Sequence, residues 1–194
     1  MTPSSPRRGR PPVADVEELR AAALAHIERV GFENVSMATL AHAVGVSLRT
    51  LHRYFPSKSD IVWGGLEQSI DALRDGMRHA DDALPAITAI SDVVVRVFAL
   101  TDDDLAVMRA RLRLIALSPE LRASQSSTFD AWKSELVAFI ARRRGESTNH
   151  LMPVVLGAAV HTAIMESLTW WASTDSVADP AECVAAALRG LDDA

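Results

Sequence analysis

The sequence has only one cysteine, Cys183, so the chain cannot form an internal disulfide or a cysteine-based metal cluster. We expect this thiol to act as a small apolar side chain on a helix. The N-terminus is polar and lacks the apolar stretch of a secretory signal. These absences favour a cytoplasmic protein over a secreted, disulfide-bonded domain.

Sequence motifs of enzymes are also missing. The chain has no glycine-rich phosphate loop, no paired-carboxylate constellation and no serine or cysteine nucleophile motif. The histidines are scattered, and His161 is followed four residues later by Met165 rather than by a second ligand. We expect His161 to be a hydrogen-bonded core or interface residue, and we expect no enzyme activity, no metal and no cofactor.

Strand patterns and membrane spans are likewise absent from the sequence. No segment alternates long enough to build a sheet, and the uncharged run 147–165 is interrupted by Asn149, His150 and Pro153. Capping residues instead precede apolar periodic segments, which predicts an all-α fold of about nine helices. Besides two short helices within 36–55, the expected ranges are 13–30, 57–79, 84–100, 103–117, 119–144, 149–173 and 180–192.

The most informative stretch is SMATLAHAVGVSLRTLHRYFPSK, residues 36–58. Ser36 is a good N-cap for a first helix, and Gly45 lies where that helix must end in a left-handed backbone conformation. Ser47 can cap a second helix after a short turn. This spacing is typical of a helix-turn-helix unit, in which the second helix enters the major groove of DNA.

The second helix has two kinds of side chain. Leu51 and Phe55 lie four residues apart and must face the core. Hydrogen-bonding and cationic groups are left on its other faces, and these are Arg49, Thr50, His52, Arg53 and Tyr54. Since any compact helical hairpin has a similar apolar pattern, the pattern alone leaves DNA binding and simple packing equally open.

The run G-V-S-x-x-T-L-x-x-Y-F-P-S-K, preceded by Gly31 and Phe32, resembles the N-terminal domain of TetR-family transcriptional regulators over about residues 13–62. The resemblance implies a homodimeric, ligand-released repressor of a palindromic operator. Its domains would be a DNA-binding domain at 13–60 and a ligand-binding and dimerisation domain at 61–194. The sequence departs from the family at Ala38 and Thr39, which predicts the loss of one phosphate contact and of a capping-box carboxylate.

Resemblance to the family also assigns DNA contacts to matching positions. The assigned residues are Ser36, Ser47, Arg49, Thr50, His52, Arg53, Tyr54 and Lys58. Ser47 and Thr50 would hold the front of the second helix to a phosphate, and Tyr54 and Lys58 its far end. The candidates for base edges are Arg49, His52 and Arg53.

A basic arm precedes this domain. Residues 1–12, MTPSSPRRGRPP, are expected to be disordered, and Arg8 to Pro11 resembles an AT-hook core. Arg8 and Arg10 would then lie in a narrow minor groove, although a solvated basic tail would have the same composition. Residues 1–60 carry eight basic and six acidic residues, a net charge of +2, whereas the remainder carries −7. This modest polarity supports DNA binding by the N-terminal part.

A narrower resemblance covers the C-terminal part. IVWGG at 61–65, RLRLIALSPELRA at 111–123 and Trp132 are similar to a TetR subgroup that includes mycofactocin-system regulators with acyl-CoA-like ligand-binding domains. The implied effector is a long-chain acyl-CoA or a similar amphipathic molecule. Candidates for an apolar tunnel are Phe98, Met108, Phe129, Trp132, Phe139 and Met165, and candidates for phosphate-binding cations are Arg109, Arg113 and Arg122. Ordinary core packing and surface ion pairs are the alternative roles of these side chains.

Residues 154–163, VVLGAAVHTA, are apolar around most of a helix, which predicts burial on more than one side. In the family the last two helices form a four-helix bundle with those of a second subunit. The interface candidates are Leu156, Ala159, Val160, Ala163, Val184 and Leu188. Ligand would alter DNA affinity through the helix expected at 57–79. A helical lipid carrier is the competing function, because it would need only the apolar cavity.

Overall fold

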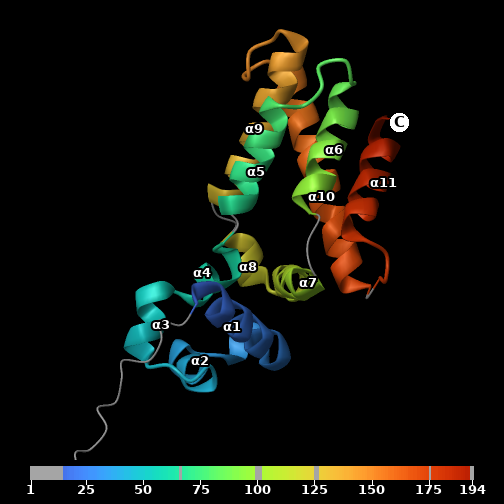
Figure 1. The fold of residues 1–194 in the computed structure, drawn as a ribbon. Coiled ribbons are helices and arrows are strands. Elements are labelled where there is room, and N and C mark those ends of the chain that lie inside the picture. The colour runs from blue at the N-terminus through green and yellow to red at the C-terminus, as the bar shows by residue number, and fades with distance from the viewer. Residues whose placement is uncertain (1–14, 66, 99–101, 125–126, 175, 193–194) are drawn as a thin grey trace, which may run out of the picture.

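A computed structural model describes residues 15–192 apart from 66, 99–101, 125–126 and 175. The basic arm, with Arg8 and Arg10, lies outside the described residues. Within them the chain forms eleven α-helices and one short 3-10 helix, and no strand. The predicted all-α fold is confirmed, and the two helices beyond the predicted nine arise because two expected helices are each divided (Figure 1).

Two N-terminal helices begin after the predicted capping residues Ser36 and Ser47, and these are α2 (Met37–Ala43) and α3 (Leu48–Tyr54). Before them lie α1 (Val16–Val30), which is capped by Asp15, and the short η1 (Phe32–Asn34), which was not predicted. The Ser36 hydroxyl accepts the Thr39 amide at 3.1 Å, and the Thr39 hydroxyl accepts the Ser36 amide at 3.0 Å. The capping box therefore forms without a carboxylate. Gly45 has the expected positive φ of 73° between α2 and α3.

The expected 57–79 helix is wrong, because Gly64 and Gly65 divide it into α4 (Lys58–Trp63) and α5 (Glu67–Arg78). The start was predicted correctly, since Ser57 and Asp60 form a capping box. Gly65 then takes a φ of 80°, which only glycine adopts readily. The glycine pair therefore ends α4 and redirects the chain.

The expected 119–144 helix is also divided, into α8 (Pro119–Ala123) and α9 (Ser127–Arg144). Ser118 caps α8 and Pro119 occupies its first turn, as predicted from the sequence. Ser124 ends it, and its hydroxyl accepts a hydrogen bond from Trp63 Nε1 at 3.2 Å. This contact fixes the end of α8 against α4.

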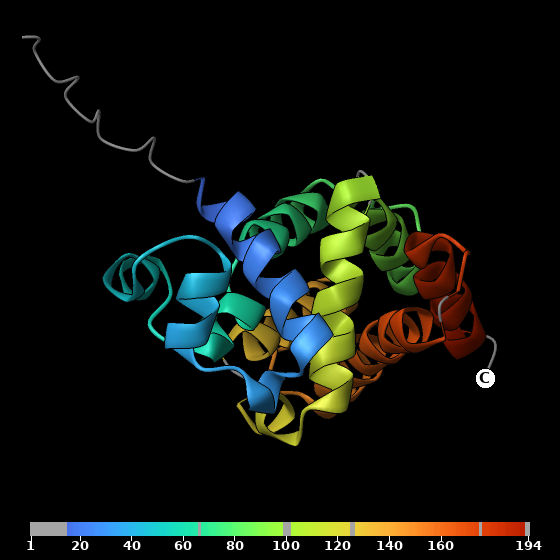
Figure 2. The same cartoon turned by 90° about the horizontal axis from the view of Figure 1, so that it is seen from below.

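The C-terminal bundle consists of α5, α6 (Ala86–Val97), α9, α10 (Leu151–Ser173) and α11 (Pro180–Asp192). Between it and the N-terminal helices lie α8 and α7 (Asp102–Leu117) (Figure 1). Seen from below, α7 runs beside α1 (Figure 2). Leu114, Ile115 and Leu121 are buried in the same apolar cluster as the cores of α1 to α4. The N-terminal helices α1 to α4 thus share their core with α7 and α8.

Helix α10 is long and apolar. It has 23 residues, and an 18-residue window within it has a mean hydropathy of 1.5, which is enough, by length and composition alone, to cross a membrane. Asn149 and His150, which interrupt the uncharged run in the sequence, lie before the helix begins. In the fold, α10 contributes Val160 and Ile164 to the main core and packs against α7, α9 and α11.

Candidate DNA-binding surface and effector cavity

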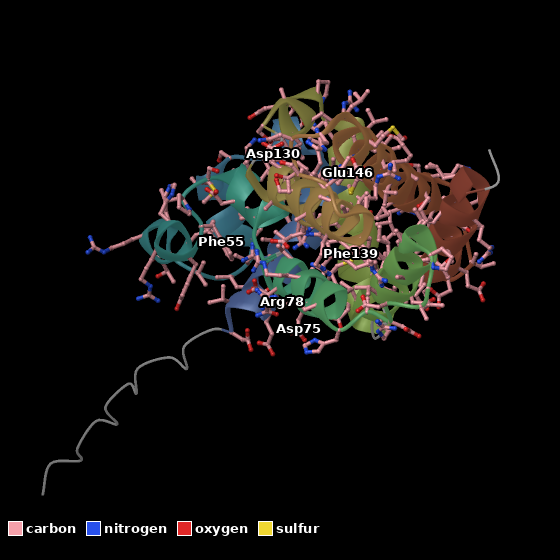
Figure 3. The ribbon with its side chains drawn as sticks, turned by 90° about the horizontal axis from the view of Figure 1, so that it is seen from above. Phe55, Asp75, Arg78, Asp130, Phe139 and Glu146 are labelled. Atoms are coloured by element: carbon pink, nitrogen blue, oxygen red, sulfur yellow. The ribbon has the colours of Figure 1, made fainter. Side chains whose placement is uncertain are left out.

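The outer face of α3 is the candidate DNA-binding surface. Leu51 and Phe55 are buried as predicted, while Arg49, His52 and Arg53 are exposed. Side chains tipped with nitrogen extend from α3 away from the rest of the molecule (Figure 3). Donors on an exposed, projecting helix are what direct readout of base edges requires.

Polar contacts within this surface orient several of the predicted residues. Arg53 Nη2 donates to Tyr54 Oη at 2.7 Å, and the guanidinium lies 4.6 Å from the Tyr54 ring centroid. The hydroxyls of Ser47 and Thr50 are 2.8 Å apart, and His52 Nδ1 lies 3.2 Å from the Pro56 carbonyl oxygen. The α3 side chains are therefore partly ordered before any DNA arrives, which lowers the entropy cost of binding.

Lys58 does not project like the α3 residues. Its Nζ donates to the Phe32 carbonyl at 2.7 Å and lies 4.4 Å from the centroid of the Phe32 ring. In this arrangement Lys58 holds α4 to η1. A phosphate contact by Lys58 stays a prediction, and it would require the side chain to exchange the carbonyl for a phosphate oxygen.

A cavity of about 270 Å³ lies between α5, α6, α7, α9 and α10. Five of the predicted tunnel residues line it, namely Phe98, Met108, Phe129, Trp132 and Met165. Phe139, the sixth, is instead buried in the bundle core at 1% exposure. The other apolar lining residues are Val97, Val107, Leu112, Ile115 and Leu168.

One end of this cavity is polar and reaches the N-terminal helices. Glu17 of α1, Gly65 and Arg111 all line it, together with Gln68 and Ser69. Asp104 of α7 is the sixth lining residue outside the apolar set, and sequence reasoning missed all six. The RLRLIALSPELRA motif, which begins at Arg111, was the available signal, but helical spacing alone does not say which of its arginines turns inward.

Arg109 and Arg113 point away from the cavity and border a separate open hollow. Arg109 donates to the carbonyls of Trp171 at 3.1 Å and Ser176 at 2.8 Å, with its guanidinium 3.8 Å from the Trp171 ring. Burial, and secondarily the charge of Arg113, lower the pKa of Arg109. Arg113 donates to the Ala172 carbonyl at 2.8 Å. The structure thus places these two arginines on the end of α10 rather than beside the predicted tunnel residues.

The remaining predicted cation, Arg122, also faces away from the cavity lining, since its guanidinium donates to the Ala116 carbonyl. The three predicted phosphate-binding arginines are therefore not brought together with the apolar tunnel residues.

His161 differs from its expected role. Its Nε2 is buried and has no hydrogen-bond partner among the described residues. The ring packs edge-on against Phe129, with centroids 5.7 Å apart. Burial is the largest cause of its lowered pKa, followed by the charge of Lys133, while Asp130 opposes them. The neutral imidazole is therefore the form that this site favours.

The predicted interface residues fall into two groups. Val160, Val184 and Leu188 have 0% exposure and belong to the main apolar core, so their prediction as surface contacts is wrong. Leu156, Ala159 and Ala163 are only partly buried. The large apolar side chains that α10 leaves exposed are Leu151, Met152, Val154, Val155 and Trp170.

Comparison with known families matches residues 84–194 to the MftR C-terminal domain and residues 19–62 to the bacterial regulatory proteins of the tetR family. Over 147 residues the chain is 27% identical to the putative mycofactocin biosynthesis transcriptional regulator MftR of Mycobacterium tuberculosis, covering 76% of this chain and 74% of that protein. It is also 27% identical to the HTH-type transcriptional regulator EthR of Mycolicibacterium smegmatis, covering 82% and 76%.

Among solved structures, the fold resembles the transcriptional regulator FadR from Bacillus subtilis in complex with stearoyl-CoA, with a TM-score of 0.65, 20% identity and coverage of 90% of this chain and 96% of that one. Thermus thermophilus FadR in complex with lauroyl-CoA has a TM-score of 0.54, 20% identity and coverage of 90% and 92%. Since the MftR C-terminal domain covers more than half of the sequence, the chain belongs to the TetR family of transcriptional regulators, with a helix-turn-helix DNA-binding domain at its N-terminus.

Proposed function

We propose that this regulator is a homodimeric repressor that binds a palindromic operator through α3 and is released by an amphipathic, long-chain effector. One observation carries the proposal. The apolar cavity ends at Glu17, Gly65 and Arg111, which lie beside the helices that position α3. An effector bound there would therefore be in contact with the DNA-binding unit itself.

Base readout is assigned to Arg49, His52 and Arg53, because all three are exposed on α3. The other assigned positions contact the phosphate backbone of DNA or cap the helices, and these are Ser36, Ser47, Thr50, Tyr54 and Lys58. Arg8 and Arg10 of the arm would add minor-groove contacts. A bidentate arginine is the commonest specific contact to guanine.

Dimerisation is assigned to the exposed face of α10 together with α11. Leu151 and Val155 are 73% and 48% exposed, an unfavourable state for large apolar side chains. Leu156, Ala159 and Ala163 extend this surface, while Val160, Val184 and Leu188 would support it from beneath. An isologous contact between two such faces relates two α3 helices by a twofold axis, which is why the operator would be palindromic.

An acyl chain is the effector portion that suits the cavity, because ten of its lining side chains are apolar or aromatic. Two FadR structures hold stearoyl-CoA and lauroyl-CoA, which supports the same class. Typical ligand pockets measure about 300–1,000 Å³, so a cavity of about 270 Å³ takes the chain and leaves the head group outside. Arg111 is the cation at that end, whereas Arg109, Arg113 and Arg122 border other surfaces.

The test is selection of bound sequences from a random duplex library, with and without stearoyl-CoA. Recovery of a palindrome that is lost with stearoyl-CoA supports the whole proposal. A palindrome that persists with stearoyl-CoA contradicts the effector class alone. No enrichment contradicts the operator proposal and favours the lipid carrier.

Two variants make this test specific to α3. Arg53→Ala should lower recovery of the palindrome, because Arg53 is assigned to a base edge. Arg78→Ala is the matched control, since Arg78 is an exposed arginine on α5, far from α3 (Figure 3). Equal recovery by both variants would contradict the assignment of α3 as the reading helix.

A further inference from the structure

Arg20 of α1 is buried to 7% exposure, although arginine is rarely buried unless its donors are satisfied. Its Nη1 donates to the carbonyls of Asp60 at 3.0 Å and Ile61 at 3.2 Å, and its Nε donates to Glu17 Oε2 at 3.1 Å. Both carbonyls belong to the last turn of α4, where carbonyl oxygens run short of helical N–H donors, although the Asp60 carbonyl also accepts the Gly64 amide at 2.9 Å. Arg20 therefore fixes the end of α4 to α1.

The same guanidinium reaches the end of the recognition helix. Arg20 Cζ lies 4.9 Å from the centroid of the Phe55 ring. Phe55 is the C-cap of α3 and is 1% exposed (Figure 3). A single side chain thus contacts α1, the end of α4 and the end of α3.

Gly64 and Gly65, between α4 and α5, leave room for the Arg20 side chain. A Cβ at Gly64 would lie 2.5 Å from Arg20 Nη1 and 2.5 Å from the Asp60 carbonyl oxygen. A Cβ at Gly65 would lie 3.2 Å from Arg20 Nε and 3.3 Å from Glu17 Oε2. The absence of side chains at 64 and 65 lets Arg20 approach the backbone.

A second arginine, from α7, binds the backbone at the end of α4. Arg111 Nη2 of α7 donates to the Gly64 carbonyl at 3.1 Å. The cavity is also lined by Glu17, Gly65 and Arg111. Arg20 does not line it and instead donates to Glu17. The polar end of the cavity is therefore built from the groups that set the position of α4.

We propose that Arg20 is the positioning residue that couples the cavity to the recognition helix, through a cluster of Glu17, Arg20, Gly64, Gly65 and Arg111 that we call the α4 clamp. This inference rests on the proposed function, because it assigns how an effector in that cavity changes DNA affinity. A ligand or side chain in the cavity that displaces Glu17 or Arg111 must shift the guanidinium of Arg20 or the backbone at Gly64. Arg20 then carries the change to Phe55, since a buried cation that lost its acceptors would pay a large desolvation penalty.

A competing route from the cavity to α4 is apolar. Phe129 lines the cavity and packs edge-on against Trp63 of α4, with ring centroids 4.9 Å apart. If this contact carried the coupling, Arg20 would be only a structural residue. The experiment must therefore separate the two routes.

The first measurement uses the full-length protein and needs no effector. Met108→Trp fills the cavity, and Val97→Phe does so from another helix in case the first variant folds poorly. Hydrogen exchange of amides in residues 47–65 should quicken by about fivefold, the lower end of usual coupling factors. In an Arg20→Lys background, filling the cavity should give no further increase over the unfilled Arg20→Lys protein, because lysine keeps the charge but loses the forked donors that would transmit the change.

Two results would overturn the proposal. These are an unchanged exchange rate in both filled proteins, and an increase on filling that persists in the Arg20→Lys background. Removal of that persisting increase by Phe129→Leu would assign the coupling to the apolar route. Thermal unfolding of each variant confirms that the compared proteins are folded.

The second measurement tests the coupling of binding sites. The ratio of operator Kd values with and without stearoyl-CoA should fall from about fivefold or more towards one in Arg20→Lys. The Kd of stearoyl-CoA for DNA-free protein should change little, since Arg20 does not line the cavity. A ratio that stays at the wild-type value would contradict the clamp. A wild-type protein that ignores stearoyl-CoA contradicts the proposed effector, while the exchange measurement still decides the clamp.

Discussion

The substitution Gly157→Ala tests how closely α9 and α10 approach. A Cβ at Gly157 would lie 2.4 Å from Val137 Cγ2 and 3.1 Å from both Val137 Cα and N. The methyl group of Val137 can rotate away, but its backbone atoms can move only if the two helices separate. Overpacking of this kind costs about 1–3 kcal/mol, and backbone contact favours the upper value.

Helix propensity opposes this cost. Alanine is more favourable than glycine inside a helix by about 1 kcal/mol. The net expectation for Gly157→Ala is therefore a loss of about 2 kcal/mol in the free energy of unfolding. For a chain of this size that corresponds to a fall in Tm of roughly 4–8 °C.

Two other helical glycines provide matched controls. A Cβ at Gly190 of α11 meets nothing within 4 Å, so Gly190→Ala should gain up to about 1 kcal/mol from propensity alone. A Cβ at Gly76 of α5 would meet the Val93 side chain, with Cγ1 at 2.5 Å, and that side chain can change rotamer. Gly76→Ala should fall between the other two.

Urea unfolding followed by far-UV circular dichroism measures all three variants, at one protein concentration because dimerisation adds to apparent stability. The order Gly190→Ala, Gly76→Ala, Gly157→Ala from most to least stable is expected. A Gly157→Ala protein as stable as the wild type would refute the argument from close backbone approach. Destabilisation by Gly190→Ala would contradict the gain expected from the higher helix propensity of alanine.

Four further predictions concern function and pH. Arg53→Ala should cost about 1–3 kcal/mol in operator affinity and relax specificity at one base pair, measured across operator variants. Deleting residues 1–11 should weaken DNA binding and flatten its salt dependence in a titration series; an unchanged slope would argue against the arm. Val155→Glu should convert the proposed dimer to monomer in analytical ultracentrifugation, because it places a charge on the exposed α10 face. The pKa of His161 is lowered in the folded protein, so as the pH falls this residue takes up a proton in the unfolded chain before it does so in the folded one. The free energy of unfolding should therefore fall as the pH drops below about 6.5. His161→Phe should reduce that loss in urea titrations at pH 7 and pH 5.

Local signals in the sequence were enough to predict much of the chain. Ser36, Ser47 and Ser57 cap helices where predicted, and Gly45 takes its left-handed conformation. These features depend on a few neighbouring residues and on backbone groups that need partners. The YFPSK motif and its surroundings likewise indicated the family, which the family comparisons confirm.

Division of the long helices was not predictable in the same way. Residues 57–79 and 119–144 both have adequate helical periodicity, and single glycines are tolerated in helices. The first ends at Gly64, where a side chain would lie 2.5 Å from Arg20 Nη1, a residue 44 positions earlier in the sequence. Ser124 ends α8 at a contact with Trp63, from another helix. Neither partner can be identified from the local pattern.

By itself, the sequence determined the helical class, most helix boundaries, the polar face of α3 and the family, because each follows from short-range periodicity, capping or a contiguous motif. Only the tertiary structure decided which arginine of α7 faces the cavity, which apolar residues of α10 are core rather than exposed, and that Arg20 joins α1, α3 and α4. The physical reason is that such roles depend on which helices meet and at what distance, and long-range packing sets that distance.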